Sequence, residues 1–275
     1  MIRVEDLWRT YTMGDHELHA LRAVDETIED GEYVAIMGPS GSGKSTLLNV
    51  LGCLDSPTRG RYWLDGEDVA GLDEEQLAEI RLRRIGFIFQ SFHLVPRLTA
   101  IQNVELPMML AGIGTRKRRK RAQALLEATG LRSQAFADVH TMSGGEQQRL
   151  ALCVALAVGP KLLLADEPTG ELDTETSLEI YELLRRLSHD GGLSVLVVTH
   201  DVALAQRTDR VVRLADGRIA TQGKRGAAEL LHVDQRGMVQ LPRDMLLETG
   251  IEETLKARVT DEGILLQRED APDEP

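Results

Sequence analysis

The sequence predicts an α/β fold built around a mostly parallel sheet that is covered on both faces. Short apolar runs with the length of buried strands alternate with segments whose apolar residues recur at helical spacing, and strands that alternate with helices form parallel sheets. The clearest unit is the apolar run Tyr33–Met37, which ends in a glycine-rich loop and continues as the helical pattern Lys44–Leu51.

The composition is that of an acidic globular protein. The 275 residues include 32 Lys and Arg and 44 Asp and Glu, for a formal charge of −12, and 42% are hydrophobic. This length allows one large domain or one domain with a small appendage. The longest apolar run, Leu150–Val158, is far shorter than the roughly 20 residues of a membrane span, and the N-terminus lacks a secretory pattern. Cys53 and Cys153 lie far apart in apolar patterns, which predicts buried thiols and a reducing cytoplasm.

The remaining elements follow from apolar periodicity and from turn and cap signals. Asp216-Gly217 predicts a turn between the last two strands, and Thr99 with Gln102 forms a capping box at the start of a helix. The expected strands are 2–8, 61–64, 85–89, 162–165 and 193–198, and the expected helices are 74–84, 116–129, 146–158 and 174–187.

The helical stretch from Thr99 to Val158 interrupts the alternation of strands and helices, which predicts an inserted helical subdomain. The small, basic stretch Gly223–Ala228 predicts a linker. We therefore expect a main domain over residues 1–228 with a helical subdomain at about 91–158, a small β-rich C-terminal segment over 229–268, and a disordered acidic tail over 269–275.

Gly38–Ser45 has the spacing of a phosphate-binding loop, with four residues between Gly38 and Gly43, then Lys44 and Ser45. Glycines let backbone N–H groups curl around phosphate oxygens, and the helix N-terminus that follows adds partial positive charge. In such a loop Lys44 neutralises the β and γ phosphates and Ser45 ligates Mg²⁺. The complete spacing between a strand and a helix argues against a plain glycine-rich turn.

A second apolar strand, Leu162–Ala165, ends abruptly in the carboxylates Asp166 and Glu167. At the carboxyl end of a central parallel strand these side chains face the ligand crevice, which suits Asp166 to hold Mg²⁺ through water and Glu167 to polarise an attacking water. Pro168 keeps Glu167 out of the helical region. A solvated acidic pair in a loop is the alternative interpretation, and the phosphate loop weakens it.

Ser143-Gly144-Gly145-Glu146-Gln147 opens the helix that follows. Ser-x-x-Glu is an ordinary capping box that satisfies backbone N–H groups. The same donors, left accessible by the two glycines, also suit a helix N-terminus that binds an anion such as a γ-phosphate.

Residues 1 to about 225 resemble the nucleotide-binding subunits of ABC transporters. Ser143–Gln147 is similar to that family's signature motif, Gln90 to its Q-loop, Glu171-Leu172-Asp173 to its D-loop and His200 to its switch histidine. Tyr11 stands where a family aromatic stacks on adenine. Each match is weak alone, but their order along one chain is specific.

The segments Ile85–Pro96, Asn103–Pro107 and Leu164–Gly170 narrow the resemblance to the lipoprotein-releasing, macrolide-exporting and FtsE-like ATPases, the MacB/LolD/FtsE-like group. Two residues depart from the family pattern. Val154 stands where arginine is usual, and Glu171 stands where a small or amide residue is commoner, which puts an arginine contact and communication between sites in doubt.

The resemblance implies a homodimer that binds and hydrolyses MgATP between its chains, on the cytoplasmic face of the cell membrane, and drives a transmembrane permease. Contact with the membrane is then made only through the permease. Gln90 would reach Mg²⁺, and His200 would donate to the γ-phosphate. The residues expected to bind nucleotide are Tyr11, Gly38, Pro39, Ser40, Gly41, Ser42, Gly43, Lys44, Ser45, Thr46, Gln90, Ser143, Gly144, Gly145 and Glu146; those expected to hold Mg²⁺ are Ser45, Gln90 and Asp166; those expected to be catalytic are Lys44, Glu167 and His200.

Two further segments invite a nucleic-acid interpretation. Arg116–Arg121 is a run of six basic residues without interleaved aromatics, which favours a solvated surface. Gly237–Leu247, Thr249–Ile251 and Glu262–Leu266 resemble AbrB-like swapped-hairpin domains, which often bind DNA as dimers. Residues 236–268 carry five basic and six acidic side chains, which lacks the charge of a DNA-binding surface. We therefore expect a dimerising or regulatory hairpin and no nucleic-acid partner, with plain folding against the main domain as the alternative.

Two other functional classes remain open at this point. One is a soluble ABC ATPase that acts on DNA or ribosomes, although such proteins usually carry two cassettes or a long coiled-coil insertion. The other is an ATP-responsive DNA-binding regulator built around the C-terminal segment.

Overall fold

The computed structural model describes residues 1–14, 16–170, 172–224, 230–231, 241, 255–260 and 263–268. Its main feature is a seven-stranded sheet in the order β11-β10-β9-β3-β8-β7-β6. The strands are β3 (Tyr33–Met37), β6 (Ile85–Ile88), β7 (Leu162–Asp166), β8 (Ser194–Val198), β9 (Arg210–Ala215), β10 (Arg218–Lys224) and β11 (Leu230–Leu231).

The centre of this sheet is parallel, as the alternation of strands and helices predicts. β3 pairs in parallel with β8 and β9, β8 with β7, and β7 with β6. β10 is antiparallel to β9 across the predicted Asp216-Gly217 turn, and β11 is antiparallel to β10. The carboxyl ends of β3, β8 and β7 therefore lie side by side at one edge.

Side chains of the central strands alternate between two separate cores. On β3, Val34 and Ile36 pack with α1 (Lys44–Leu51) in one core, while Tyr33 packs in another with α6 (Thr174–His189). The short helix α7 (Val202–Ala205) covers the same face as α6. Because both faces are buried, these strands are continuous apolar runs.

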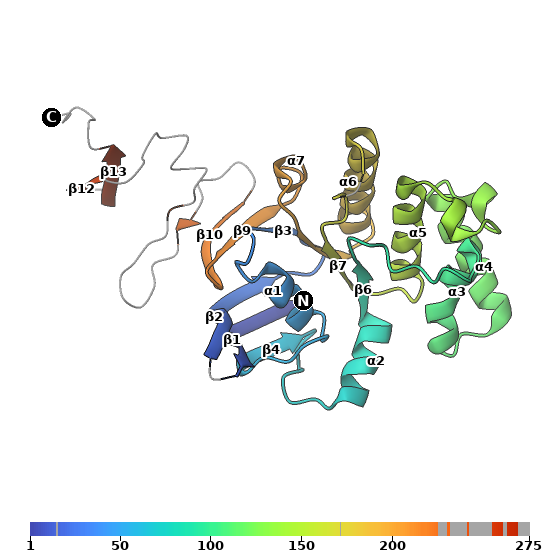
Figure 1. The fold of residues 1–275 in the computed structure, drawn as a ribbon, viewed down its shortest axis with the longest axis horizontal. Coiled ribbons are helices and arrows are strands. Elements are labelled where there is room, and N and C mark those ends of the chain that lie inside the picture. Colours follow the sequence, from blue (N-terminus) through green and yellow to red (C-terminus); the bar gives the residue numbers. More distant parts are fainter. Residues whose placement is uncertain are drawn as a thin grey trace.

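A second, antiparallel sheet covers the α1 side, in the order β2-β1-β4-β5 (Figure 1). Its strands are β1 (Ile2–Met13), β2 (His16–Ile28), β4 (Arg59–Leu64) and β5 (Glu67–Asp68). The sequence predicts β4 and the start of β1 but misses β2 altogether. The reason is that register shifts interrupt the pairing of β1 with β2, so the buried residues Leu21, Val24 and Ile28 do not alternate with period two.

The helices at the right of Figure 1 share a core of their own, formed with Val104, Leu126 and Cys153 among others. They are α3 (Ala100–Leu110), α4 (Thr115–Ala128) and α5 (Gly144–Leu156), and α2 (Glu74–Arg84) lies between this group and the antiparallel sheet. α5 begins two residues earlier than the periodicity predicts, because Ser143 is its N-cap. Cys53 and Cys153 are buried free thiols, as predicted.

The basic run forms the start of α4. Most of its side chains are exposed, while Arg118 and Arg119 are half-buried, and Arg119 pairs with Glu105. Val154, one of the two departures from the family pattern, is half-buried on α5, and Glu171 lies outside the described residues.

Only part of the C-terminal segment is described. β12 (Leu255–Thr260) and β13 (Gly263–Arg268) form an antiparallel hairpin. Most of Gly237–Ile251, the predicted linker beyond residue 224 and the predicted tail at 269–275 lie outside the described residues. Among the helices that the structure describes, none is long and apolar enough to span a membrane.

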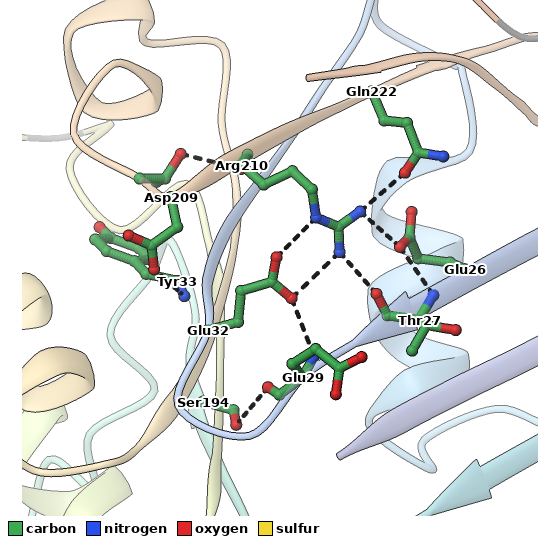
Figure 2. Close-up of polar contacts among 10 residues, drawn as sticks. Glu26, Thr27, Glu29, Glu32, Tyr33, Ser194, Asp209, Arg210 and Gln222 are labelled. Atoms are coloured by element: carbon green, nitrogen blue, oxygen red, sulfur yellow. Dashed lines mark hydrogen bonds and ion pairs between the residues drawn. The ribbon is translucent and has the colours of Figure 1, made fainter. Parts of the chain in front are cut away.

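A buried arginine joins the two sheets (Figure 2). Arg210 at the start of β9 is 9% exposed; its Nη1 lies 2.7 Å from Glu26 Oε1 and its Nε lies 2.7 Å from Glu32 Oε1. The guanidinium also donates to the carbonyl of Thr27 and to the side chain of Gln222. Burial raises the pKa of Glu26, and the positive charge of Arg210 opposes that rise.

We expect Arg210→Met to lower the free energy of unfolding by about 3–5 kcal/mol, because it leaves two mostly buried carboxylates, whose side chains are 7% and 16% exposed, without their cation. Urea denaturation at neutral pH measures the loss. In the variant the folded-state pKa of Glu26 should lie further above its unfolded value, because the positive charge that opposes the rise is gone. The folded variant then binds more protons as the pH falls, so the stability difference from the wild type should shrink at lower pH.

The matched control is Arg185→Met, which breaks the exposed pair between Arg185 and Glu182 and should cost under about 1 kcal/mol. A loss at position 210 no larger than that of the control would show that the buried network does not stabilise the fold.

Candidate functional site

A cleft of about 670 Å³ lies at the edge of the sheet where β3 and β7 end. Its lining brings together residues that are far apart in sequence: the loop after β3, the end of β7, Gln90 after β6, and Tyr11 on β1. Of the residues predicted to bind nucleotide, to hold the metal or to be catalytic, the cleft is lined by Tyr11, Ser40, Gly41, Gly43, Lys44, Ser45, Thr46, Gln90, Asp166 and Glu167.

The loop 38–43 is folded tightly against its neighbours. Gly38 has φ +152°, and a Cβ there would lie 2.0 Å from the carbonyl oxygen of Leu214 on β9. Gly43 has φ +101°, and a Cβ there would lie 2.4 Å from the carbonyl oxygen of Ala20 on β2. Both positions therefore require glycine. Gly43 is also the N-cap of α1, so the first amides of that helix have no side-chain cap and are suited to an anion.

Lys44 is folded back onto this loop. Its Nζ donates to the carbonyl oxygens of Gly38 at 2.8 Å and of Pro39 at 2.9 Å. The ammonium group is therefore held against the backbone of the loop, and Lys44 lines the cleft. Ser42 is buried within the loop, and its backbone carbonyl accepts a hydrogen bond from Gly217 N–H in the turn between β9 and β10.

Asp166, the last residue of β7, faces the start of α1. Burial raises its pKa, and the hydrogen bond from Ser45 and the charge of Lys44 oppose that rise. Ser45, Asp166 and Gln90 all line the cleft, and all carry oxygen donors. In the part of the chain that the structure describes, no cluster of three His, Cys, Asp or Glu side chains could hold a metal ion. A single carboxylate with neutral oxygen donors is a set suited to Mg²⁺, which keeps waters and phosphate oxygens as its other ligands.

Glu167 is held in an uncommon backbone conformation at the end of β7. Its φ is +47°, so it is outside the right-handed helical region, but it is left-handed rather than extended as is usual before a proline; its N–H donates to Val198 O on β8 at 2.9 Å. Its Oε1 lies 2.9 Å from Nδ1 of His200, and its Oε2 accepts from the Thr199 hydroxyl. A left-handed conformation costs a non-glycine residue on the order of 1–3 kcal/mol, and the contacts with β8 maintain it here.

His200 contacts this carboxylate but does not line the cleft. It follows β8 and lines a neighbouring cavity of about 210 Å³, which shares Glu167 with the cleft. Its side chain is 77% exposed, whereas that of Glu167 is 19% exposed. The histidine is therefore accessible from outside the chain while it contacts the carboxylate.

The segment Ser143–Glu146 does not line the cleft of its own chain. It forms the N-terminus of α5, where the predicted capping box is present in both directions: Glu146 N–H donates to Ser143 Oγ, and Ser143 N–H donates to Glu146 Oε2. The hydrogen bond from Ser143 N–H lowers the pKa of Glu146. Gly145 packs against α6, where a Cβ would lie 2.6 Å from Thr176 Cγ2.

One side of the cleft, formed by β2 and by the turn after β9, does not follow from the sequence pattern. Because β2 is not predicted, its contribution cannot be anticipated from periodicity. The Asp216-Gly217 turn carries a sequence signal, but only as a turn. The lining residues that the sequence did not indicate are Leu18, His19, Ala20 and Arg22 on β2, Asp216 and Gly217 in the turn, and Val198 at the end of β8.

The sequence of this chain is similar to those of known proteins. The family model described as ABC transporter matches residues 21–170. An uncharacterized ABC transporter ATP-binding protein of Thermotoga maritima is 48% identical over 226 residues, which cover 82% of this chain and 96% of the relative. The macrolide export ATP-binding/permease protein MacB of Brucella abortus is 48% identical over 80% of this chain, which corresponds to 34% of that longer protein.

A solved structure extends the likeness to three dimensions. It is the dimeric, post-hydrolysis state of an ATP-binding cassette bound to ADP and Pi, from a protein of Methanocaldococcus jannaschii. It is 43% identical to this chain, with a TM-score of 0.78, and the match covers 83% of this chain and all of that one.

Proposed function

This chain belongs to the ABC transporter family as an ATP-binding and ATP-hydrolysing subunit, and we propose that it drives a membrane permease of the lipoprotein-release, macrolide-export or FtsX type. The observation that carries this proposal is the cleft, in which the phosphate loop faces the carboxylates at the end of β7. The similarity to the ATP-binding part of MacB supports the type of permease.

In the proposed complex the cleft holds MgATP. The adenine stacks on Tyr11, the amides of the loop 38–43 and of the first turn of α1 bind the phosphates, and Lys44 neutralises the β and γ phosphates. Ser45, Gln90 and Asp166 would hold Mg²⁺, which would supply neutralisation of the charge on the phosphate oxygens.

Glu167 is the proposed general base. Its carboxylate orients the attacking water and accepts a proton from it as the water oxygen bonds to the γ-phosphorus, while the bond from that phosphorus to the β–γ bridging oxygen breaks and ADP leaves. His200, 2.9 Å from this carboxylate, would turn toward the γ-phosphate and donate a hydrogen bond to it. The strained backbone at Glu167 supports this role, because it holds the carboxylate toward the cleft before nucleotide arrives.

We propose that two copies of the chain complete each other's sites. Ser143, Gly144, Gly145 and Glu146 of one chain would close over the γ-phosphate bound by the other. The position of this segment outside its own cleft supports the arrangement, as does the dimeric state of the related cassette. Binding of ATP then favours the closed dimer by its differential contact with the phosphate, and hydrolysis releases the dimer.

The proposed location is the cytoplasmic face of the cell membrane, reached through the permease.

The proposed organisation is an ATPase domain over residues 1–228, a C-terminal segment over 229–268 and a tail over 269–275. An AbrB-like dimerising role for the segment stays a prediction. Affinity purification of the chain tests the alternative function, that of an ATP-responsive DNA-binding regulator.

Glu167→Gln should bind ATP with near-normal affinity and lose turnover by about 10²–10⁴-fold, because the amide keeps the shape of the side chain and cannot accept the proton. Steady-state phosphate release and binding of a fluorescent ATP analogue measure the two effects. Glu179→Gln on the exposed face of α6 is the matched control, and it should hydrolyse normally. Wild-type turnover in Glu167→Gln would refute the assigned role.

Two variants that are each inactive should regain ATP hydrolysis when they are mixed. A dimer of Lys44→Ala and Ser143→Arg chains retains one intact site, formed by the loop of one chain and the signature segment of the other. Phosphate release should therefore reappear in the mixture. Lys44→Ala mixed with Glu167→Gln is the control, because both changes lie in the same half of a site and no intact site can form. If neither mixture released phosphate, the result would contradict the shared site.

The permease itself is tested by affinity purification of the Glu167→Gln chain with ATP from gently solubilised membranes. An integral membrane protein with a large extracytoplasmic domain should be recovered. Recovery of the ATPase alone or of DNA would favour the soluble ATPase or the DNA-binding regulator instead.

A further inference from the structure

Tyr11 lines the cleft, and its side chain is held by two contacts, one at the hydroxyl and one over a face of the ring. Its hydroxyl donates to Asp55 Oδ2 at 2.7 Å. The guanidinium carbon of Arg9, two residues earlier on the same strand, lies 4.5 Å from the centre of the Tyr11 ring. One face of the ring is therefore covered by a cation, and only the other face is available to a planar ligand.

Arg9 and Asp55 also hold each other. Arg9 Nε donates to Asp55 Oδ2 at 2.8 Å, and Arg9 Nη2 lies 2.7 Å from Asp55 Oδ1. The pairing is bidentate, and each side chain is 22% exposed. Ser56 N–H donates to the same carboxylate. Such a fork is more rigid than a single surface ion pair, which would leave the ring free to rotate.

Helix α1 connects Asp55 to the phosphate loop. Asp55 lies just beyond the C-terminal end of that helix, where its N–H and that of Leu54 donate to Asn49 O. The N-terminal end of the same helix follows the phosphate loop. One short helix therefore fixes the phosphate loop at one end and the anchor of the Tyr11 ring at the other.

We propose that Arg9 and Asp55 are positioning residues, whose ion pair holds the ring of Tyr11 in the orientation that receives the adenine of ATP. This inference rests on the proposed role of Tyr11 in the nucleotide site. Because the ring is ordered before ATP arrives, binding does not have to immobilise it. The pair acts on the base end of the nucleotide and leaves the phosphate end unaffected.

The chain contains a matched control. On β1, Trp8 Nε1 donates to Asp6 at 2.8 Å. Arg59 on β4 pairs with Asp6 at 2.7 Å, and its guanidinium carbon lies 6.0 Å from the Trp8 ring. These three residues repeat the chemistry of Tyr11, Asp55 and Arg9 but lie outside the cleft. Arg59→Ala therefore removes an equivalent contact without touching the nucleotide.

The test measures the KM and kcat of ATP hydrolysis and the inhibition constant of inorganic tripolyphosphate, which has no base. Asp55→Ala and Arg9→Lys should raise the KM for ATP about three- to tenfold, the effect of freeing one ordered side chain. The change in kcat should be smaller, and the tripolyphosphate constant should stay within about twofold. Arg59→Ala should leave all three values unchanged.

Tyr11→Phe keeps the ring and removes the hydroxyl, and so tests the same contact from the other side. It should raise the KM for ATP, and adding Asp55→Ala to it should have less effect than Asp55→Ala alone, because the two changes remove one shared hydrogen bond.

An unchanged KM for ATP in both Asp55→Ala and Arg9→Lys would overturn the proposal. So would a parallel rise in the tripolyphosphate constant, which would indicate general damage to the site. A wild-type chain that neither hydrolyses ATP nor binds tripolyphosphate would instead refute the proposed function.

Discussion

The site depends on the parallel alignment of β3, β8 and β7. Because parallel strands end at the same edge, the phosphate loop after β3 and the carboxylates Asp166 and Glu167 after β7 face one cleft. β8 lies between these strands, so its backbone accepts the N–H of Glu167, and the histidine that follows it contacts the Glu167 side chain. A change in this strand order would separate the groups by the width of a strand.

The antiparallel sheet completes the cleft, and Arg210 joins this sheet to the main one. Its guanidinium contacts Glu26 and Thr27 at the end of β2, Glu32 before β3, and Gln222 on β10. Burying these charges is costly, and their mutual geometry offsets that cost. The same strand, β2, brings Ala20 against Gly43 and Gly217, where only glycine fits. One strand, β2, therefore carries both the cleft contacts of Ala20 and, at its other end, the carboxylate of Glu26 that pairs with Arg210.

The fold holds the two ends of the proposed nucleotide site in different ways. The proposed phosphate end consists of backbone amides and Lys44, which are fixed by close packing around Gly38. The proposed base end is one aromatic ring, which is held by the ion pair of Arg9 with Asp55. The segment beginning at Ser143 contacts neither end within its own chain. A single chain thus presents an ordered but open half of a site, which suits an enzyme that acts when two copies meet.

The sequence by itself determined the main elements and the residues that carry chemistry. The strand at 33–37 and the helices at 44–51 and 74–84 match their predicted bounds, because their period and caps are local properties. The shared cleft of the phosphate loop, Asp166 and Glu167 follows from the rule for parallel strands. Only the tertiary structure decided the course of β2, the left-handed backbone of Glu167, and the contacts of Tyr11 with Arg9 and Asp55. Bulges hide β2 from periodicity, and Tyr11 meets Asp55 across 44 residues of chain. No local pattern encodes such a contact, because it exists only after distant segments have packed together.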